Sequence, residues 1–266
     1  MVHFVGAGSG APDLITVRGL RLLREADVVI FAGSLVNPAL LLETKEGCEI
    51  HDSAVMDLPQ VLDVMKRAEA ENKTTVRLHT GDPAIYGAIR EQIDALSLLG
   101  IDCDVCPGVS SFCGAASSLK AELTLPGLSQ TVIITRMAGR TGVPERENFR
   151  SLAAHHATMA VFLSAGMLRE MESELILAGY EPDTPAAIVY KATWPEEKKI
   201  LCTVSTLEEA AKREGIKKTA MILVGDVLGA GRGTEYEKSR LYAPEFTTGY
   251  RTGTKAKEEN ERETSI

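Results

Sequence analysis

The sequence predicts an α/β protein of two domains, the first with a mostly parallel sheet and the second with a mixed sheet. Short apolar, strand-like runs alternate with helix-period segments along most of the chain. The stretch 122–127, which contains Pro and Gly, interrupts this alternation and is interpreted as the interdomain link. Beyond it, two strand-like runs flank a short turn, which predicts a hairpin and therefore a mixed second sheet.

The first predicted domain, residues 1–125, alternates strands and helices throughout. Thr16 and Asp57 are good N-cap residues, so helices are expected to begin just after them. Asp82 and Pro83 likewise predict a helix from residue 84. The expected strands are 2–6, 27–32, 48–51, 74–79 and 101–106, and the expected helices are 16–25, 57–71, 84–99 and 109–121.

The second predicted domain, residues 126–240, continues the alternation and adds the hairpin, with its turn at 193–197. The expected strands are 131–137, 158–163, 186–192, 199–204 and 220–224, and the expected helices are 145–154, 166–178 and 206–214. Residues 241–266 form a C-terminal extension. Its last part, from Thr252 on, is almost wholly polar or charged, which predicts a disordered tail.

Composition limits the classes of partner. The net charge of −8 makes the chain a poor non-specific binder of nucleic acid. The sequence contains no apolar run long enough for a membrane span and opens on a strand rather than a signal peptide, so a cytoplasmic protein is expected. Cys103 and Cys106 would lie on opposite faces of a strand, and no zinc-type spacing accompanies them. We therefore expect reduced thiols and no metal site.

The stretch 6–11, Gly-Ala-Gly-Ser-Gly-Ala, fits the relaxed pattern of a dinucleotide-binding turn. That turn needs a helix opening directly on the glycines and an acid at the end of the next strand. Here the first good N-cap is Thr16, and the second strand ends in Gly33-Ser34. The context argues against NAD and favours glycines that allow a sharp turn or close approach to another ligand.

Two turns at expected strand ends are candidates for a small-molecule site. Gly81 follows strand 74–79, and Ser110 and Ser111 follow strand 101–106. Ligands of open α/β sheets bind at the carboxyl ends of strands. Each turn alone is equally well explained as a strand-to-helix connection whose hydroxyl caps the helix. Two such turns at neighbouring strand ends favour a ligand site.

Arg136 and Arg140 gather positive charge where strand 131–137 ends. Surface arginines are the ordinary explanation for such a cluster, but in an acidic chain these two are also suited to holding ligand carboxylates. The metalloprotease, hydrolase-elbow and P-loop motifs do not occur, and no residue is singled out as catalytic.

Taken in order, the stretches 5–16, 81–83 and 107–111 resemble the tetrapyrrole (corrin/porphyrin) methylase family. They match the family patterns V-G-A-G-x-G-x-x-x-L-I-T, G-D-P and P-G-x-S. The resemblance extends over nearly the whole chain outside the tail. It implies the two-domain tetrapyrrole methylase fold, with S-adenosylmethionine (SAM) bound between the domains. One departure is Thr248, which stands where histidine is expected.

Further stretches resemble the members of this family that act in cobalamin biosynthesis, namely 31–36, 122–126, 129–131 and 135–141. They imply SAM-dependent C-methylation of precorrin-4 or cobalt-precorrin-4 at C-11, with S-adenosylhomocysteine (SAH) as a product. Methylation of another corrin carbon or of uroporphyrinogen III stays open within the family. An NAD-dependent oxidoreductase or a nucleotide-binding module stays open outside it.

The resemblance also assigns residues to the two ligands. The residues expected at SAM are Ser9, Gly81, Asp82, Ile85, Ser110, Ser111, Ser164 and Ala192. The residues expected at the tetrapyrrole are Gly8, Gly10, Ser34, Arg136 and Arg140. A homodimer is expected as well. Methyl transfer needs in-line positioning and exclusion of water more than an acid or base, which agrees with the lack of a recognisable triad.

Overall fold

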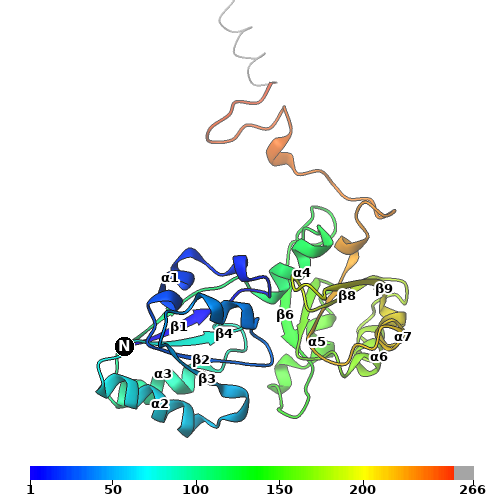
Figure 1. Ribbon diagram of the computed structural model, residues 1–266. Coiled ribbons are helices and arrows are strands. Elements are labelled where there is room, and N and C mark those ends of the chain that lie inside the picture. The colour runs from blue at the N-terminus through cyan, green and yellow to red at the C-terminus, as the bar shows by residue number, and fades with distance from the viewer. Residues whose placement is uncertain (255–266) are drawn as a thin grey trace, which may run out of the picture.

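The computed structural model describes residues 1–254 and has two α/β domains side by side, each built on a five-stranded sheet (Figure 1). The strand order is β3-β2-β4-β1-β5 in the first sheet and β6-β7-β10-β8-β9 in the second. The predicted two-domain α/β fold is therefore confirmed. Residues 255–266, the greater part of the predicted tail, lie outside the described residues.

The first sheet is wholly parallel, because each of its four strand pairings is parallel. All five strands therefore end at the same edge, which faces the second domain in Figure 1. The strands are β1 (Val2–Gly6), β2 (Val28–Phe31), β3 (Glu49–Asp52), β4 (Thr75–His79) and β5 (Cys103–Cys106). Cys103 and Cys106 pack in different hydrophobic clusters, on opposite faces as predicted.

Side-chain caps mark the starts of the first two helices of this half. The Thr16 hydroxyl accepts from the Gly19 amide at 3.0 Å, and Asp57 forms a capping box with Gln60. The helices are α1 (Val17–Glu25), α2 (Leu58–Ala70), α3 (Ile89–Leu98) and α4 (Ser111–Leu119). Short 3-10 turns lie at Pro12–Leu14, Pro38–Glu43 and Ser53–Val55.

The helix predicted from residue 84 begins at Ile89 instead. Tyr86 and Ala88 have left-handed backbones, with φ of 56° and 50°, and such residues cannot continue an α-helix. The Asp82 carboxylate accepts from the Ala84 amide at 2.8 Å and from the Gly108 amide at 2.9 Å. Asp82 thus caps a tight turn and ties it to a distant segment, rather than capping a helix.

The second sheet is mixed, as predicted from the hairpin. β6 and β7 pair in parallel, β10 runs antiparallel to both β7 and β8, and β8 and β9 form the antiparallel hairpin. The strands are β6 (Val132–Arg136), β7 (Thr158–Phe162), β8 (Pro185–Tyr190), β9 (Lys198–Thr203) and β10 (Ala220–Val224).

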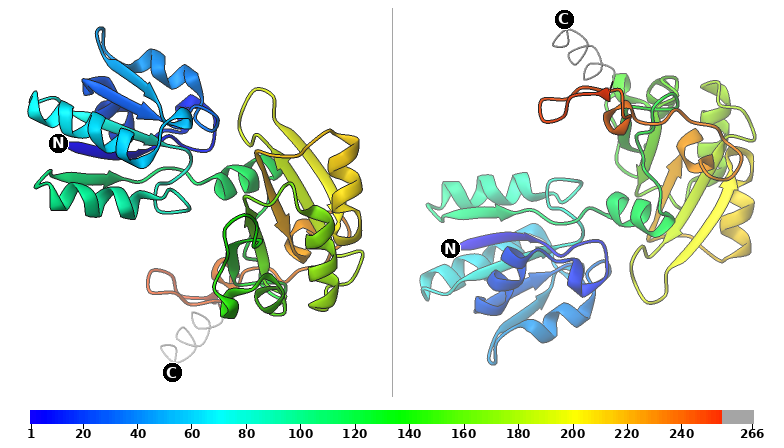
Figure 2. Two further views of the ribbon diagram at one scale, coloured as in Figure 1. Left: turned by 90° about the horizontal axis from the view of Figure 1, so that it is seen from below. Right: turned by 90° about the horizontal axis from the view of Figure 1, so that it is seen from above.

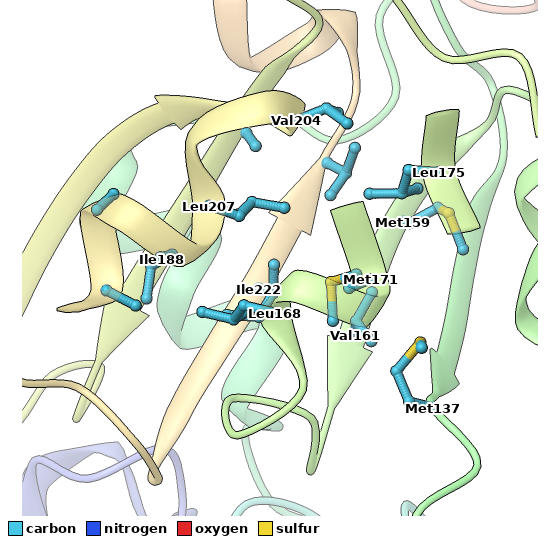
Figure 3. Close-up of a cluster of buried hydrophobic side chains, with 14 of the residues drawn as sticks. Met137, Met159, Val161, Leu168, Met171, Leu175, Ile188, Val204, Leu207 and Ile222 are labelled. Atoms are coloured by element: carbon cyan, nitrogen blue, oxygen red, sulfur yellow. The ribbon is translucent and has the colours of Figure 1, made fainter. Parts of the chain in front are cut away.

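Three helices cover one face of this sheet: α5 (Phe149–Ala153), α6 (Leu168–Leu177) and α7 (Leu207–Arg213). Met171 and Leu175 of α6 and Leu207 of α7 pack with Met159 and Ile222 of the sheet in one buried cluster (Figure 3). Further 3-10 turns lie at Glu145–Glu147, Val204–Thr206, Asp226–Gly229 and Arg240–Tyr242.

Helix α4 lies between the two sheets in both views of Figure 2. Its residues Ala115 and Leu119 pack in a buried cluster with Ala160, Val189 and Leu223 of the second sheet. By packing, α4 therefore belongs with the second sheet, although it precedes the predicted boundary at residue 125. No helix in residues 1–254 is long and apolar enough to cross a membrane.

Candidate cofactor and substrate site between the two domains

Three turns of the first domain meet beyond the ends of β1, β4 and β5. The Ala7 amide donates to the His79 carbonyl at 2.7 Å, and the Gly81 amide donates to the Gly8 carbonyl at 2.8 Å. A Cβ added to Gly108 would lie 2.2 Å from the Gly81 carbonyl oxygen and 2.7 Å from Gly6 Cα. The turns therefore touch backbone to backbone, which only glycine allows.

The glycine-rich loop after β1 also packs closely against residues farther along the chain. Gly8 has φ +82°, and a Cβ there would lie 2.7 Å from the Leu14 carbonyl oxygen. A Cβ on Gly10 would lie 2.1 Å from the Trp194 ring and 2.7 Å from the Ala192 carbonyl oxygen. Close packing within the protein thus gives these glycines a structural role. Their expected contact with the tetrapyrrole stays a prediction.

The NAD alternative loses its structural basis at this loop. A dinucleotide-binding turn places a helix N-terminus directly on the glycines. Here the 3-10 turn Pro12–Leu14 intervenes, and α1 begins only at Val17.

Gly81 lies next to the N-terminus of α4. Its φ is +61°, and a Cβ there would lie 3.4 Å from both the amide nitrogen and the hydroxyl of Ser111. Ser110 is buried at the N-cap position, yet its hydroxyl does not cap the helix. The first N–H groups of an α-helix have no acceptor within the helix. A glycine turn beside such groups suits a ligand that presents hydrogen-bond acceptors or negative charge.

The turn that carries Ile85 reaches the second domain through the residue that follows it. The Tyr86 ring lies 5.3 Å from the Phe162 ring, centroid to centroid. Burial raises the pKa of Tyr86, while the nearby Arg136 guanidinium acts in the opposite direction. Ile85 itself is partly buried. Sequence reasoning missed Tyr86, because a tyrosine in a left-handed backbone leaves no local signal.

The predicted residues of the second domain share one edge of its sheet. Since β10 is antiparallel to both β7 and β8, the strands β6, β7 and β8 run in the same direction. Arg136 ends β6, Ser164 follows β7 and Ala192 follows β8. The buried Ser164 hydroxyl donates to the Phe162 carbonyl at 2.7 Å and accepts from the Met137 amide at 2.9 Å.

Arg136 holds the loop that follows it. Its guanidinium donates to the carbonyls of Thr141 at 3.1 Å and Gly142 at 2.6 Å. Arg140, within that loop, is exposed, and so is Ser34 in the turn after β2. Within residues 1–254, no hydrogen bond or ion pair joins Arg140 or Ser34 to another predicted site residue. The structure thus brings the glycine loop, Gly81, Ser111 and Ala192 together but not these two.

Two buried polar side chains lie behind the turn at Gly81. The Arg77 guanidinium donates to the Ile30 carbonyl at 3.2 Å, and burial lowers its pKa to about 10. His79 Nε2 is buried without a hydrogen-bond partner in the described part of the chain. Burial, helped by the Arg77 charge, lowers the pKa of His79 to about 3. His79 is therefore neutral near pH 7.

A hollow of about 670 Å³ lies elsewhere, between α6 and α7, and none of the predicted site residues lines it. Among residues 1–254, no group of three or more His, Cys, Asp or Glu side chains is placed to hold a metal ion.

A family model for tetrapyrrole (corrin/porphyrin) methylases matches residues 1–208. The chain belongs to the tetrapyrrole methylase family. Among its relatives, the cobalt-precorrin-4 C(11)-methyltransferase of Methanocaldococcus jannaschii is 53% identical over 250 residues, covering 94% of this chain and 95% of the relative. The precorrin-4 C(11)-methyltransferase of Pseudomonas aeruginosa is 41% identical over 252 residues, covering 95% of this chain and 99% of the relative.

Solved structures of the family confirm the fold. The X-ray structure of a cobalt precorrin-4 methyltransferase, a cobalamin biosynthetic enzyme, matches with a TM-score of 0.84 at 49% identity, covering 85% of this chain and 95% of the other. The uroporphyrin-III C-methyl transferase of Thermus thermophilus, complexed with S-adenosyl homocysteine, matches with a TM-score of 0.72 at 26% identity. The match covers 86% of this chain and 93% of the other.

Proposed function

We propose that this methylase is a SAM-dependent C-methyltransferase of cobalamin biosynthesis that acts at C-11 of precorrin-4 or cobalt-precorrin-4. The observation that carries the proposal is the 53% identity, over 94% of the chain, with a cobalt-precorrin-4 C(11)-methyltransferase. Identity is 53% and 48% to two cobalt-precorrin-4 enzymes but 41% to the precorrin-4 enzyme of Pseudomonas aeruginosa. We therefore favour the cobalt-bearing substrate.

SAM supplies a methyl group activated on a sulfonium when it is bound. The turn at Gly81 and the free N–H groups of α4 fit a cofactor rich in acceptors, and the Ser110 hydroxyl is not used by its own helix. We place SAM against the turns after β4 and β5 and the strand ends of the second sheet. The residues proposed there are Ser9, Gly81, Asp82, Ile85, Ser110, Ser111, Ser164 and Ala192.

The tetrapyrrole carries several carboxylates, and we place it against the glycine loop, Ser34 and the two arginines at the end of β6 and in the loop that follows it. Gly8, Gly10, Ser34, Arg136 and Arg140 are the residues proposed there. Arg140 is the freer cation, since the Arg136 guanidinium already donates to loop carbonyls. In this arrangement the chain orients two ligands and excludes water, and transfer between them requires no acid or base residue.

We further propose a homodimer in the cytoplasm. The five cysteines are free thiols in the structure, which suits a reducing compartment. Residues 238–254 extend away from the body of the molecule (Figure 1). They expose the apolar side chains of Leu241, Tyr242 and Tyr250, as expected of a segment that packs on a second copy. Light scattering of wild type and of Leu241→Ser with Tyr242→Ser tests this, because only wild type should have the mass of a dimer.

The test of the cofactor is calorimetry with SAM, SAH and NAD. SAM and SAH should bind, and NAD should not. Gly81→Val should abolish or strongly weaken SAM binding. Gly100→Val is the matched control, because Gly100 has a similar φ of +68° with no heavy atom within 4 Å and precedes β5, at the opposite end of that strand from the site. Both substitutions impose the same backbone strain, so only Gly81→Val should affect the cofactor. Binding of NAD with no response to SAM would overturn the proposal.

A further inference from the structure

One threonine holds the two domains together by hydrogen bonds. Thr193, in the turn of the β8–β9 hairpin, pairs its hydroxyl with the Ser9 hydroxyl at 3.1 Å and accepts from the Ala11 amide at 3.0 Å. In the part of the chain that the structure describes, these are the only hydrogen bonds that join residues 1–106 to residues 120–254.

Thr193 adopts an unfavourable backbone to place this hydroxyl. Its φ is +67°, in the left-handed region, where a β-branched residue is a genuine outlier. Strain of this kind persists only where the surroundings over-determine it, and it is concentrated at functional positions. An asparagine or glycine would relieve the strain but would not place a hydroxyl at the same point.

The turn is anchored from its own side as well. The Thr193 amide donates to Glu197 at 2.6 Å, and the Ser118 hydroxyl of α4 donates to the same carboxylate oxygen. Beside it, the Trp194 ring fills the space next to Gly10. The hairpin turn, α4 and the glycine-rich loop therefore meet at a single polar junction centred on Thr193, whose hydroxyl contacts the loop and whose amide shares Glu197 with α4.

We propose that Thr193 is a positioning residue, a latch that fixes the glycine-rich loop of the first domain against the hairpin of the second. Thr193 bonds to Ser9 and directly follows Ala192 in the chain, and both Ser9 and Ala192 are among the residues proposed to contact SAM. The latch therefore sets the spacing of the two halves of the cofactor site, and this part of the inference rests on the proposed function.

The matched variants are Thr193→Val, Thr193→Ser and Thr219→Val. Valine keeps the shape and the β-branch of Thr193 and removes only the hydroxyl, whereas serine keeps the hydroxyl. Thr219 is a second threonine with a left-handed backbone, φ 56°, which makes no hydrogen bond across the domains within residues 1–254. Thr219→Val thus carries the same kind of change without touching the latch.

The first readout needs no ligand. Hydrogen exchange measured by mass spectrometry follows the peptide that contains the Ala11 amide. Thr193→Val should exchange there roughly fivefold faster than wild type, because the amide loses its acceptor. Thr193→Ser and Thr219→Val should match wild type. Unchanged exchange in Thr193→Val would overturn the latch, whether or not any cofactor binds.

The second readout is SAH binding, followed by calorimetry and by the fluorescence of Trp194, the one tryptophan of the chain. Thr193→Val should weaken SAH about tenfold while the thermal midpoint changes little, and Thr193→Ser should restore the affinity. Equal SAH affinity in Thr193→Val and wild type would overturn the positioning role. Failure of wild type itself to bind SAH would instead overturn the proposed function, while faster exchange at Ala11 would still support the latch.

Discussion

The buried imidazole of His79 makes stability depend on pH. Its pKa is lowered from an ordinary value of 6.5 to about 3 in the folded protein. Between these values the unfolded chain binds a proton that the folded chain does not, so acid favours unfolding. From pH 7 to pH 5, this group should lower the free energy of unfolding by about 2 kcal/mol, and the loss should continue toward pH 3.

His79→Phe should remove that share of the pH dependence, because it keeps a ring beside Phe4 and leaves no group to titrate. Urea unfolding at pH 7 and pH 5 measures the difference. The exposed His155→Gln serves as a control and should keep the wild-type pH dependence. An unaltered pH slope in His79→Phe would mean that other groups cause it.

For single residues, the sequence predicts those contacts that a side chain makes with its near neighbours in the chain. Thr16 and Asp57 cap the helices expected of them, because an N-cap interacts only with the next three residues. Asp82 has the same local signal, but its carboxylate is also bonded to Gly108, which lies 26 residues farther along. Thr193 has no local signal at all, since its partners Ser9 and Ala11 come more than 180 residues earlier.

Among the elements, the contact of the turns after β1, β4 and β5 is the most sensitive to added bulk. Gly108→Ala would place a methyl group 2.2 Å from the Gly81 carbonyl oxygen. The nearest atoms all belong to the backbone of Gly81 and Gly6, which cannot move aside as a flexible side chain could. We expect a loss of about 2–3 kcal/mol in the free energy of unfolding, together with a loss of SAM affinity.

Gly142→Ala is the control for this prediction, because no heavy atom lies within 4 Å of a Cβ there. Chemical denaturation measures the free energy of unfolding of the two variants, and calorimetry measures their affinity for SAM. Wild-type stability in Gly108→Ala would show that the turns do not touch as described.

Two variants should separate the roles of Arg136, at the end of β6, and Arg140, in the loop that follows. Arg140→Ala removes an exposed charge, so it should raise the KM for the tetrapyrrole about tenfold or more and leave SAM affinity unchanged. Arg136→Ala should, in addition, speed hydrogen exchange in the loop 137–142, because the Arg136 guanidinium donates to the carbonyls of Met137, Thr141 and Gly142. Wild-type KM in both variants would make them ordinary surface residues.

The sequence predicts the strands, the hairpin and the mixed second sheet because alternation and turn residues are local patterns. It does not predict which sheet α4 packs against. The small apolar residues Ala115 and Ala116 suit the faces of many sheets, and only the three-dimensional structure places them on β8 and β10.

For the whole molecule, the relation between the domains is the property that sequence patterns leave undetermined. The predicted site residues lie at strand ends in both halves, and resemblance alone implies that they face a common ligand. The structure adds two physical contacts across the domains, the Tyr86–Phe162 ring pair and the Thr193 junction. Sequence analysis assigned no functional role to Tyr86, Phe162 or Thr193.

Methyl transfer itself tests the central claim most directly. Purified protein is incubated with SAM carrying an isotope-labelled methyl group and with cobalt-precorrin-4, precorrin-4 or uroporphyrinogen III, and the products are analysed by mass spectrometry and NMR. The account predicts one labelled methyl group at C-11 of cobalt-precorrin-4, with one SAH formed for each methyl transferred. Label that appears only on uroporphyrinogen III, or at a corrin carbon other than C-11, would contradict it.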